Sequence, residues 1–276
     1  MPRLDLDLNT KLKLLVTGNP GIGKTTLCGT AMDDERTAPV LVLSFAGNPQ
    51  VLASRPLERR PTVWNCKSLA EVGNILTWIK GGQAHGKLRE EMELEGDVFF
   101  QTLCVDHLAE FQRLQYADII GTPDAAFDIH SGKLSADEVA SKKSYKIWQL
   151  MWLRSIALAR VLSDPLWPTH VVLTVHIKAG EDGSGTIYEP MLWGASDYEV
   201  PGYVLAHGWL TWVKDMPKSV RDLSNGAERV LIFKDTMQHV TLKEQYTGRI
   251  PQYVFDPTIP LLVDYIGGKH AQTAKA

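Results

Sequence analysis

The sequence predicts an α/β fold in which a mostly parallel sheet lies between helices. Two observations predict it: short apolar runs that recur along the chain, and a glycine-rich loop that joins the first run to a helix. Continuous apolar runs of this length are typical of strands that are buried on both faces of a parallel sheet. They cover residues 13–16, 39–45, 98–106 and 170–176. Helical patterns between the runs complete the alternating order of such a fold.

The loop after the first run carries the pattern G-x-x-x-x-G-K-T from Gly18 to Thr25. Glycines let the backbone approach a phosphate, and successive backbone N–H groups form an anion-binding concavity. Lys24 adds a positive charge for the β- and γ-phosphates, and the Thr25 hydroxyl is an oxygen ligand suited to Mg²⁺. The pattern therefore predicts a site for ATP and Mg²⁺, formed by Gly18, Asn19, Pro20, Gly21, Ile22, Gly23, Lys24, Thr25 and Thr26.

Two later strands end in polar residues that we expect to lie beside this loop at the nucleotide site. The run 98–106 ends in Asp106, the Walker B pattern, and we expect this carboxylate to support Mg²⁺ through a water. The run 170–176 ends in His176, at the position of a group that senses the γ-phosphate. Many strands end in aspartate and most lone histidines are structural, so both assignments depend on their position relative to the loop.

The remaining segments give weaker signals. Ser68 and Glu71 predict the start of a helix that ends at residues 81–82. A long helix over residues 136–162 is dense in tryptophan and is the most basic in the chain, whereas residues 178–187 are expected to form a mobile loop. Strands expected at 208–213, 228–233 and 239–243 would extend the sheet as hairpins. We expect one domain over residues 1–266 and a disordered tail over residues 267–276.

Composition narrows the functional classes. The 276 residues are 44% hydrophobic and 22% charged, as in a folded soluble protein, and the net charge of −3 predicts no overall attraction to nucleic acid. The three cysteines are far apart and predict neither a disulfide framework nor a zinc site. No signal peptide or apolar run of transmembrane length is present in the sequence, so we expect a cytoplasmic protein without a membrane partner.

Together, the loop from Gly18 to Thr25 and the strands ending at Asp106 and His176 resemble the phage-encoded RecA-like AAA ATPases. Some members of that group act in single-strand annealing or recombination. The resemblance implies a RecA-like P-loop NTPase core with a C-terminal β-hairpin extension, and assembly into a ring or filament. It also implies a K-x-R motif that reaches the γ-phosphate of a neighbouring subunit; Lys243 matches its lysine, and Gln245 replaces its arginine.

A second departure concerns the attacking water. The group commonly carries a glutamate after the second strand, but residues 44–48 contain no carboxylate, and position 107 is histidine. Glu110 is the nearest substitute for a catalytic base and is equally compatible with an exposed helix position.

The resemblance therefore implies a slow, oligomer- or DNA-stimulated ATPase that acts on single-stranded DNA in phage recombination or replication, with a possible partner protein. The alternative is a nucleotide-dependent loader or adaptor that hydrolyses little ATP. A small-molecule kinase is disfavoured, because the sequence contains no arginine-rich lid motif.

Overall fold

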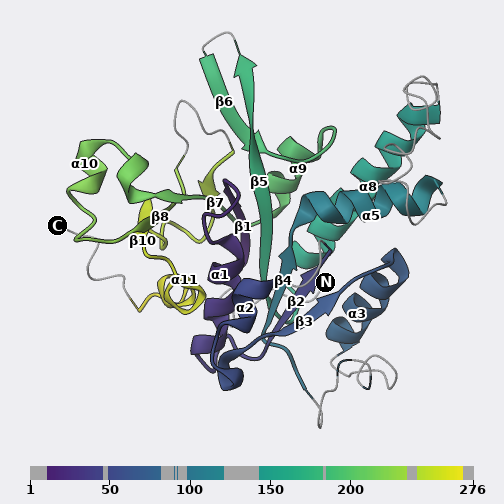
Figure 1. Ribbon diagram of the computed structural model, residues 1–276, viewed down its shortest axis with the longest axis horizontal. Helices are drawn as coiled ribbons and strands as arrows, with labels where there is room; N and C mark the ends of the chain where they lie inside the picture. Colours follow the sequence, from purple (N-terminus) through teal and green to yellow (C-terminus); the bar gives the residue numbers. More distant parts are fainter. Residues whose placement is uncertain are drawn as a thin grey trace.

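The computed structural model describes residues 11–45, 49–81, 90, 92, 98–120, 143–182, 185–234 and 241–269. Within these ranges the chain forms a ten-stranded sheet with the main order β10-β8-β7-β1-β5-β4-β2-β3 (Figure 1). The strands are β1 (Lys13–Gly18), β2 (Val40–Ser44), β3 (Thr62–Asn65), β4 (Thr102–Asp106), β5 (His170–Asp182), β6 (Gly185–Pro190), β7 (Ala206–Trp212), β8 (Arg229–Ile232), β9 (Lys243–Glu244) and β10 (Tyr253–Phe255).

Helices cover both faces of this sheet. The α-helices are α1 (Lys24–Gly29), α2 (Gln50–Ala53), α3 (Leu69–Gly81), α5 (Leu108–Ile120), α8 (Lys143–Ser163), α9 (Ser196–Tyr203), α10 (Lys218–Arg221) and α11 (Ile259–Ile266). Short 3₁₀ helices are η1 (Thr30–Asp33), η2 (Leu57–Arg59) and η3 (Val213–Asp215).

The central strands are parallel, as the sequence predicts. β1 lies between β5 and β7 and is parallel to both, and the parallel pairing continues through β4, β2 and β3. Antiparallel strands lie at the other side, where β8 pairs with β7 and with β10. Because the carboxyl ends of parallel strands share one edge, this order brings the loops after β1, β2, β4 and β5 together.

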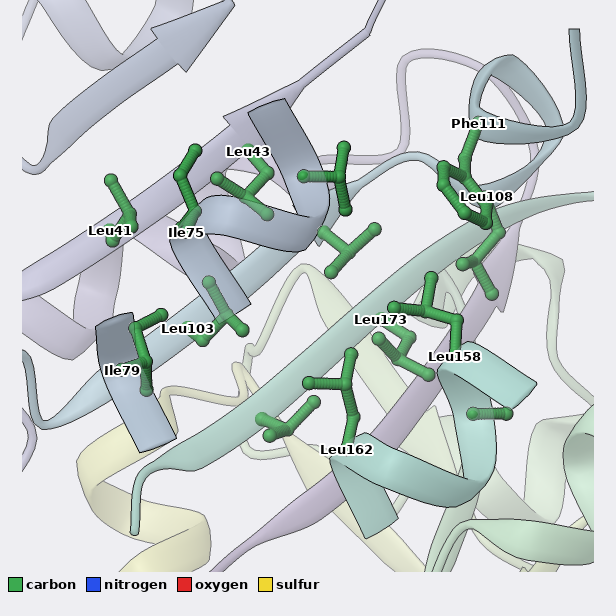
Figure 2. Close-up of a cluster of buried hydrophobic side chains, with 14 of the residues drawn as sticks. Leu41, Leu43, Ile75, Ile79, Leu103, Leu108, Phe111, Leu158, Leu162 and Leu173 are labelled. Carbon is green, nitrogen blue, oxygen red and sulfur yellow. The ribbon is translucent and has the colours of Figure 1, made fainter. Parts of the chain in front are cut away.

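Side chains alternate along each strand between two cores. Leu15 of β1 packs under α3, α5 and α8, whereas Leu14 and Val16 pack under α1, α2 and α11. Figure 2 shows the first core, where Leu41, Leu43, Leu103 and Leu173 of the strands meet side chains of α3, α5 and α8. Both faces of the strands are therefore buried, which explains their continuous apolar sequences.

The start of α3 follows the capping pattern in the sequence. The Glu71 backbone N–H donates to the Ser68 hydroxyl at 3.2 Å, and the Glu71 carboxylate accepts a hydrogen bond from the Lys67 backbone N–H at 3.0 Å. The first bond satisfies one of the backbone donors that a helix start leaves without partners, and the second holds the residue before the N-cap against the first turn. The expected helix over 136–162 begins, within the described residues, at Lys143 as α8 and ends at Ser163.

The prediction of a loop over residues 178–187 is wrong. Strand β5 continues to Asp182 and pairs antiparallel with β6, from Ile177 opposite Pro190 to Asp182 opposite Gly185. Lys178 also forms an ion pair across these strands with Glu189 at 3.7 Å. The glycines and charges suggested a loop, but cross-strand pairs such as this one stabilise a two-stranded ribbon, which extends beyond the neighbouring strands in Figure 1.

The C-terminal part extends the sheet through β7. Both β8 and β9 pair antiparallel with β7, and β10 pairs with β8. Residues 267–269 form a turn after α11, whereas residues 270–276 of the expected tail lie outside the described residues. None of the described helices is both long enough and apolar enough to cross a membrane.

Candidate functional site

A pocket of about 360 Å³ opens at the edge of the sheet where the central parallel strands end. The strand register explains its position, since Gly18 is opposite His176 and Ser44 is opposite Asp106. Its walls come from the loop after β1, the starts of α1 and α2, and the ends of β2, β4 and β5. The lining residues are Gly21, Gly23, Lys24, Thr25, Thr26, Ser44, Pro49, Val51, Asp106, His107 and His176.

The backbone of the glycine-rich loop has a conformation that requires glycine at two positions. Gly21 and Gly23 have φ angles of 77° and 101°, which residues with a β-carbon rarely adopt. A β-carbon at Gly23 would also lie only 2.5 Å from Nη1 of Arg229. The loop therefore keeps its shape only with the spacing of glycines that the sequence carries.

Lys24 is the first residue of α1, and only 5% of it is exposed. Its Nζ donates to the carbonyl oxygens of Gly18 and Asn19 at 2.8 and 2.9 Å, and it lies 2.9 Å from Nδ1 of His176. Burial lowers the pKa of Lys24 to about 8, and the charge of Asp106 opposes that shift. The ammonium group is thus held inside the loop, beside the residue at the end of β5.

Thr25 and Asp106 are joined directly. The Thr25 hydroxyl donates to Oδ2 of Asp106 at 2.8 Å, and the hydroxyl of Thr174 donates to Oδ1 of the same carboxylate at 2.6 Å. Thr174 lies on β5 and is fully buried. The two threonines therefore hold the Asp106 carboxylate from neighbouring elements.

This set of oxygen atoms suits Mg²⁺. The described residues include no group of three or more carboxylate, histidine or cysteine side chains that could hold a metal ion by themselves. Mg²⁺ usually keeps several waters and is held by one or two protein oxygens together with phosphates of the substrate. Thr25 would ligate the ion, and Asp106 would hold one of its waters.

Two histidines line the pocket at the ends of β4 and β5. The rings of His107 and His176 lie 4.3 Å apart at 79°. Burial lowers the pKa of His107 to about 4, with the charge of His176 contributing, and burial also lowers the pKa of His176, with Lys24 contributing. Both rings are therefore neutral near pH 7.

Two of the expected catalytic residues do not line this pocket. The Glu110 carboxylate accepts a hydrogen bond from Arg113 at 2.7 Å, one turn along α5. Lys243 donates to the carbonyl oxygen of Gly202 at 2.8 Å, so within its own chain it contacts α9. A role for Lys243 at the site of a neighbouring subunit stays a prediction.

Several residues at the site were not predicted from the sequence. Ser44 and His107 follow from a simple rule, because residues at or just after the carboxyl ends of adjacent parallel strands lie at one edge. Thr174 is two residues before His176, so on a strand its side chain lies on the same face. Arg229 gave no such signal, since its place beside Gly23 depends on the pairing of β7 with β8.

The comparison with known families agrees with this geometry. Residues 10–241 match a family model described as an AAA domain, and a comparison with curated proteins found no match. The mostly parallel sheet and the loop at its edge fit the P-loop NTPase fold, and the family indicates a nucleotide-binding ATPase. The chain belongs to the AAA domain family.

Proposed function

We propose that this protein is a RecA-like ATPase that binds ATP with Mg²⁺, assembles into a homo-oligomer and acts on single-stranded DNA. The observation that carries the nucleotide site is the convergence of Lys24, His176, Thr25 and Asp106 from three elements on one pocket. A volume of about 360 Å³ falls within the 300–1,000 Å³ range typical of small-molecule sites.

Each residue has a distinct role in this proposal. Backbone N–H groups of the loop and the ammonium of Lys24 bind the β- and γ-phosphates, where hydrogen bonds to charged groups are the strong ones. The Thr25 hydroxyl and the Asp106 carboxylate hold Mg²⁺, which neutralises charge that develops on the phosphates during transfer. His176 lies beside Lys24 and so contacts the γ-phosphate, the group that differs between ATP and ADP.

Orientation of the attacking water is the weak point of this site. Asp106 is the one carboxylate that lines the pocket in the described part of the chain, and it is already engaged by Thr25 and Thr174. His107 also lines the pocket, but its pKa is lowered to about 4. Its ring can therefore orient the attacking water by a hydrogen bond, but it is too weak a base to accept the proton of that water efficiently. We therefore expect turnover well below the ~10 s⁻¹ median of enzymes.

Hydrolysis across a dilution series tests the proposal that Lys243 completes a neighbouring site. Turnover per chain should rise with protein concentration and with added single-stranded DNA. Measurements of phosphate release with and without an oligonucleotide check both points. Turnover that is fast, independent of concentration and insensitive to DNA would contradict the proposal.

Contact with single-stranded DNA is supported by α8. This helix exposes Tyr145, Trp148 and Lys146, and aromatic and basic side chains together suit base stacking and phosphate contact. The basic residues that the sequence places on this helix are Lys142, Lys143, Lys146, Arg154 and Arg160. Arg154 is paired with Asp118 at 2.8 Å, and Arg160 lies over the ring of Tyr203 at 5.9 Å. Lys142 lies outside the described residues, and the side chain of Lys143 is likewise not described.

A binding experiment can locate this contact. Replacing Tyr145 and Lys146 by alanine should weaken binding of a fluorescent single-stranded oligonucleotide in ATP and low salt by at least tenfold, because stacking alone contributes about 1–3 kcal/mol per base. Lys218→Ala removes an exposed lysine from α10 and serves as the matched control. An oligonucleotide that binds the double variant and the wild type equally would exclude α8.

The second candidate is a loader or adaptor switch that binds ATP and hydrolyses little of it, recruiting a recombination or replication partner. The position of Glu110 favours it, since this carboxylate contacts Arg113 and does not line the pocket. Tight ATP binding with turnover near background, in both the presence and absence of DNA, would support this candidate over the ATPase.

A further inference from the structure

One arginine of the C-terminal strands lies against the glycine-rich loop, next to Gly23. Arg229 is the first residue of β8, and its side chain covers Gly23: a β-carbon there would lie 2.5 Å from Nη1, 3.7 Å from Cζ and 3.9 Å from Cδ of Arg229. Gly23 itself lines the pocket. A guanidinium group is therefore held at the loop that binds phosphate.

The surroundings of Arg229 leave part of this group without a partner. Its Nε is buried and hydrogen-bonds to no group among the described residues. The nearest carboxylate to its backbone, Asp256, accepts instead from the backbone N–H groups of Glu228 and Arg229, at 3.1 and 3.0 Å. The Arg229 guanidinium forms no ion pair within the described ranges, so its charge is not neutralised beside the loop, and this position favours an anion.

The order of strands determines which part of a nucleotide Arg229 faces. Strands β7 and β8 lie on one side of β1, whereas β5 and β4, which carry His176 and Asp106, lie on the other (Figure 1). Lys24 and Thr25 contact these two residues, so the γ-phosphate and the metal belong on that second side. Arg229 is on the side away from the γ-phosphate.

We infer that Arg229 binds the α- and β-phosphates of the nucleotide from within the same chain. This inference rests on the proposed nucleotide site. ADP retains both of these phosphates, so Arg229 contributes equally to the affinity for ATP and for ADP. Arg229 thus binds the α- and β-phosphates, which hydrolysis leaves on the nucleotide, whereas His176 contacts the γ-phosphate, which hydrolysis removes.

The experiment measures ATP and ADP affinities of the wild type, Arg229→Met and Arg229→Gln, using fluorescent nucleotides at several salt concentrations. Methionine keeps the unbranched apolar stem and removes the charge, and glutamine is a second replacement should methionine prevent folding. Arg221→Met removes an exposed arginine from α10 and is the matched control. Thermal unfolding without nucleotide identifies the variants that are folded.

Both Arg229 variants should lose at least tenfold in affinity for ATP and ADP alike, and their binding should depend less on salt than that of Arg221→Met. A loss confined to ATP would overturn the inference, because it would place Arg229 at the γ-phosphate. A loss with an unchanged salt dependence would also overturn it, since Arg229 would then only support the loop. A folded Arg229 variant that binds both nucleotides with wild-type affinity would also overturn the inference.

Lys24→Ala separates this inference from the proposed function. If the wild type binds ATP and Lys24→Ala binds it at least tenfold more weakly, the nucleotide site stands, and the Arg229 variants then test the inference alone. If the folded wild type binds neither nucleotide, the proposed function itself fails.

Discussion

Replacing Thr174 with valine removes one hydroxyl from beside Asp106 while nearly preserving the shape of the side chain. In the wild type that buried hydroxyl donates to Oδ1 of Asp106 at 2.6 Å, and Thr25 donates to Oδ2 at 2.8 Å. The variant therefore keeps the Asp106 carboxylate but removes one of the two hydroxyl groups that orient it.

The structure allows the size of this effect to be worked out. A hydrogen bond to a charged group contributes about 1.5–3 kcal/mol, and because Asp106 lines the pocket, water can replace part of that. We expect the free energy of unfolding to fall by about 1–2 kcal/mol. Asp106 would hold a water of the ion, and outer-shell groups of this kind typically contribute about 10–100-fold to metal affinity. Because Thr174→Val removes only one of the two hydroxyls that hold Asp106, the increase in ATP affinity caused by Mg²⁺ should shrink by about three- to tenfold.

Titrations with a fluorescent ATP analogue, in Mg²⁺ and in EDTA, measure this increase. Thr102→Val is a matched control. Thr102 is fully buried and begins β4, the strand that ends at Asp106, and its hydroxyl donates to the carbonyl oxygen of Thr37 at 2.6 Å. It should cost similar stability and leave the effect of Mg²⁺ unchanged. An equal change in the effect of Mg²⁺ in the two variants, or no change in either, would contradict the role assigned to the Thr174 hydroxyl.

Three further predictions concern other parts of the chain. Lys243→Ala should lower turnover per subunit while ATP affinity stays within about twofold, the pattern of a contact made mainly in the transition state; equal turnover across a dilution series would contradict it. Burial, with Lys11 and Lys13 nearby, lowers the pKa of His170 to about 3. Below pH 6.5 the unfolded chain therefore binds more protons than the folded chain. As the pH is lowered from 6.5 toward 3, the free energy of unfolding should fall by up to about 1.4 kcal/mol per pH unit. His170→Asn keeps an acceptor for the Leu12 N–H and should flatten this dependence in urea unfolding at pH 7 and 5, whereas an unchanged slope would exclude His170 as its cause. Leu103→Ala in the core should cost about 2–5 kcal/mol in the same assay, whereas Leu57→Ala, at a residue that is 77% exposed, should stay within about 0.5 kcal/mol; similar costs for the two would contradict the assigned core.

The parts of the site that the sequence predicts are those in which local spacing dictates geometry. The loop from Gly18 to Thr25 must form a compact turn before a helix, so its residues identify the site without any tertiary information. Asp106 and His176 follow from the rule that buried parallel strands share a carboxyl edge. The observed register, with Gly18 opposite His176, agrees with that rule.

Other features depend on contacts between distant segments. Glu110 lies in the first turn of α5, and whether its carboxylate enters the pocket depends on how that helix rotates as it packs against the sheet; its observed partner, Arg113, lies one turn further along the same helix. The ribbon of β5 and β6 depends on pairing between the two strands. Its glycines and charged residues are more typical of a loop, so the sequence alone does not predict the pairing. Arg229 reaches Gly23 only because β8 runs antiparallel to β7 and so begins at the nucleotide edge.

The most direct test of the account is calorimetric titration of the folded protein with ATP in Mg²⁺, beside Lys24→Ala. We expect saturable binding of one ATP per chain in the wild type. The variant should bind ATP at least tenfold more weakly, because Lys24 contributes about 1.5–3 kcal/mol through each charge-assisted bond to phosphate. Equal affinity in the two proteins, or no binding by a folded wild type, would contradict the claim that this loop binds a nucleoside triphosphate.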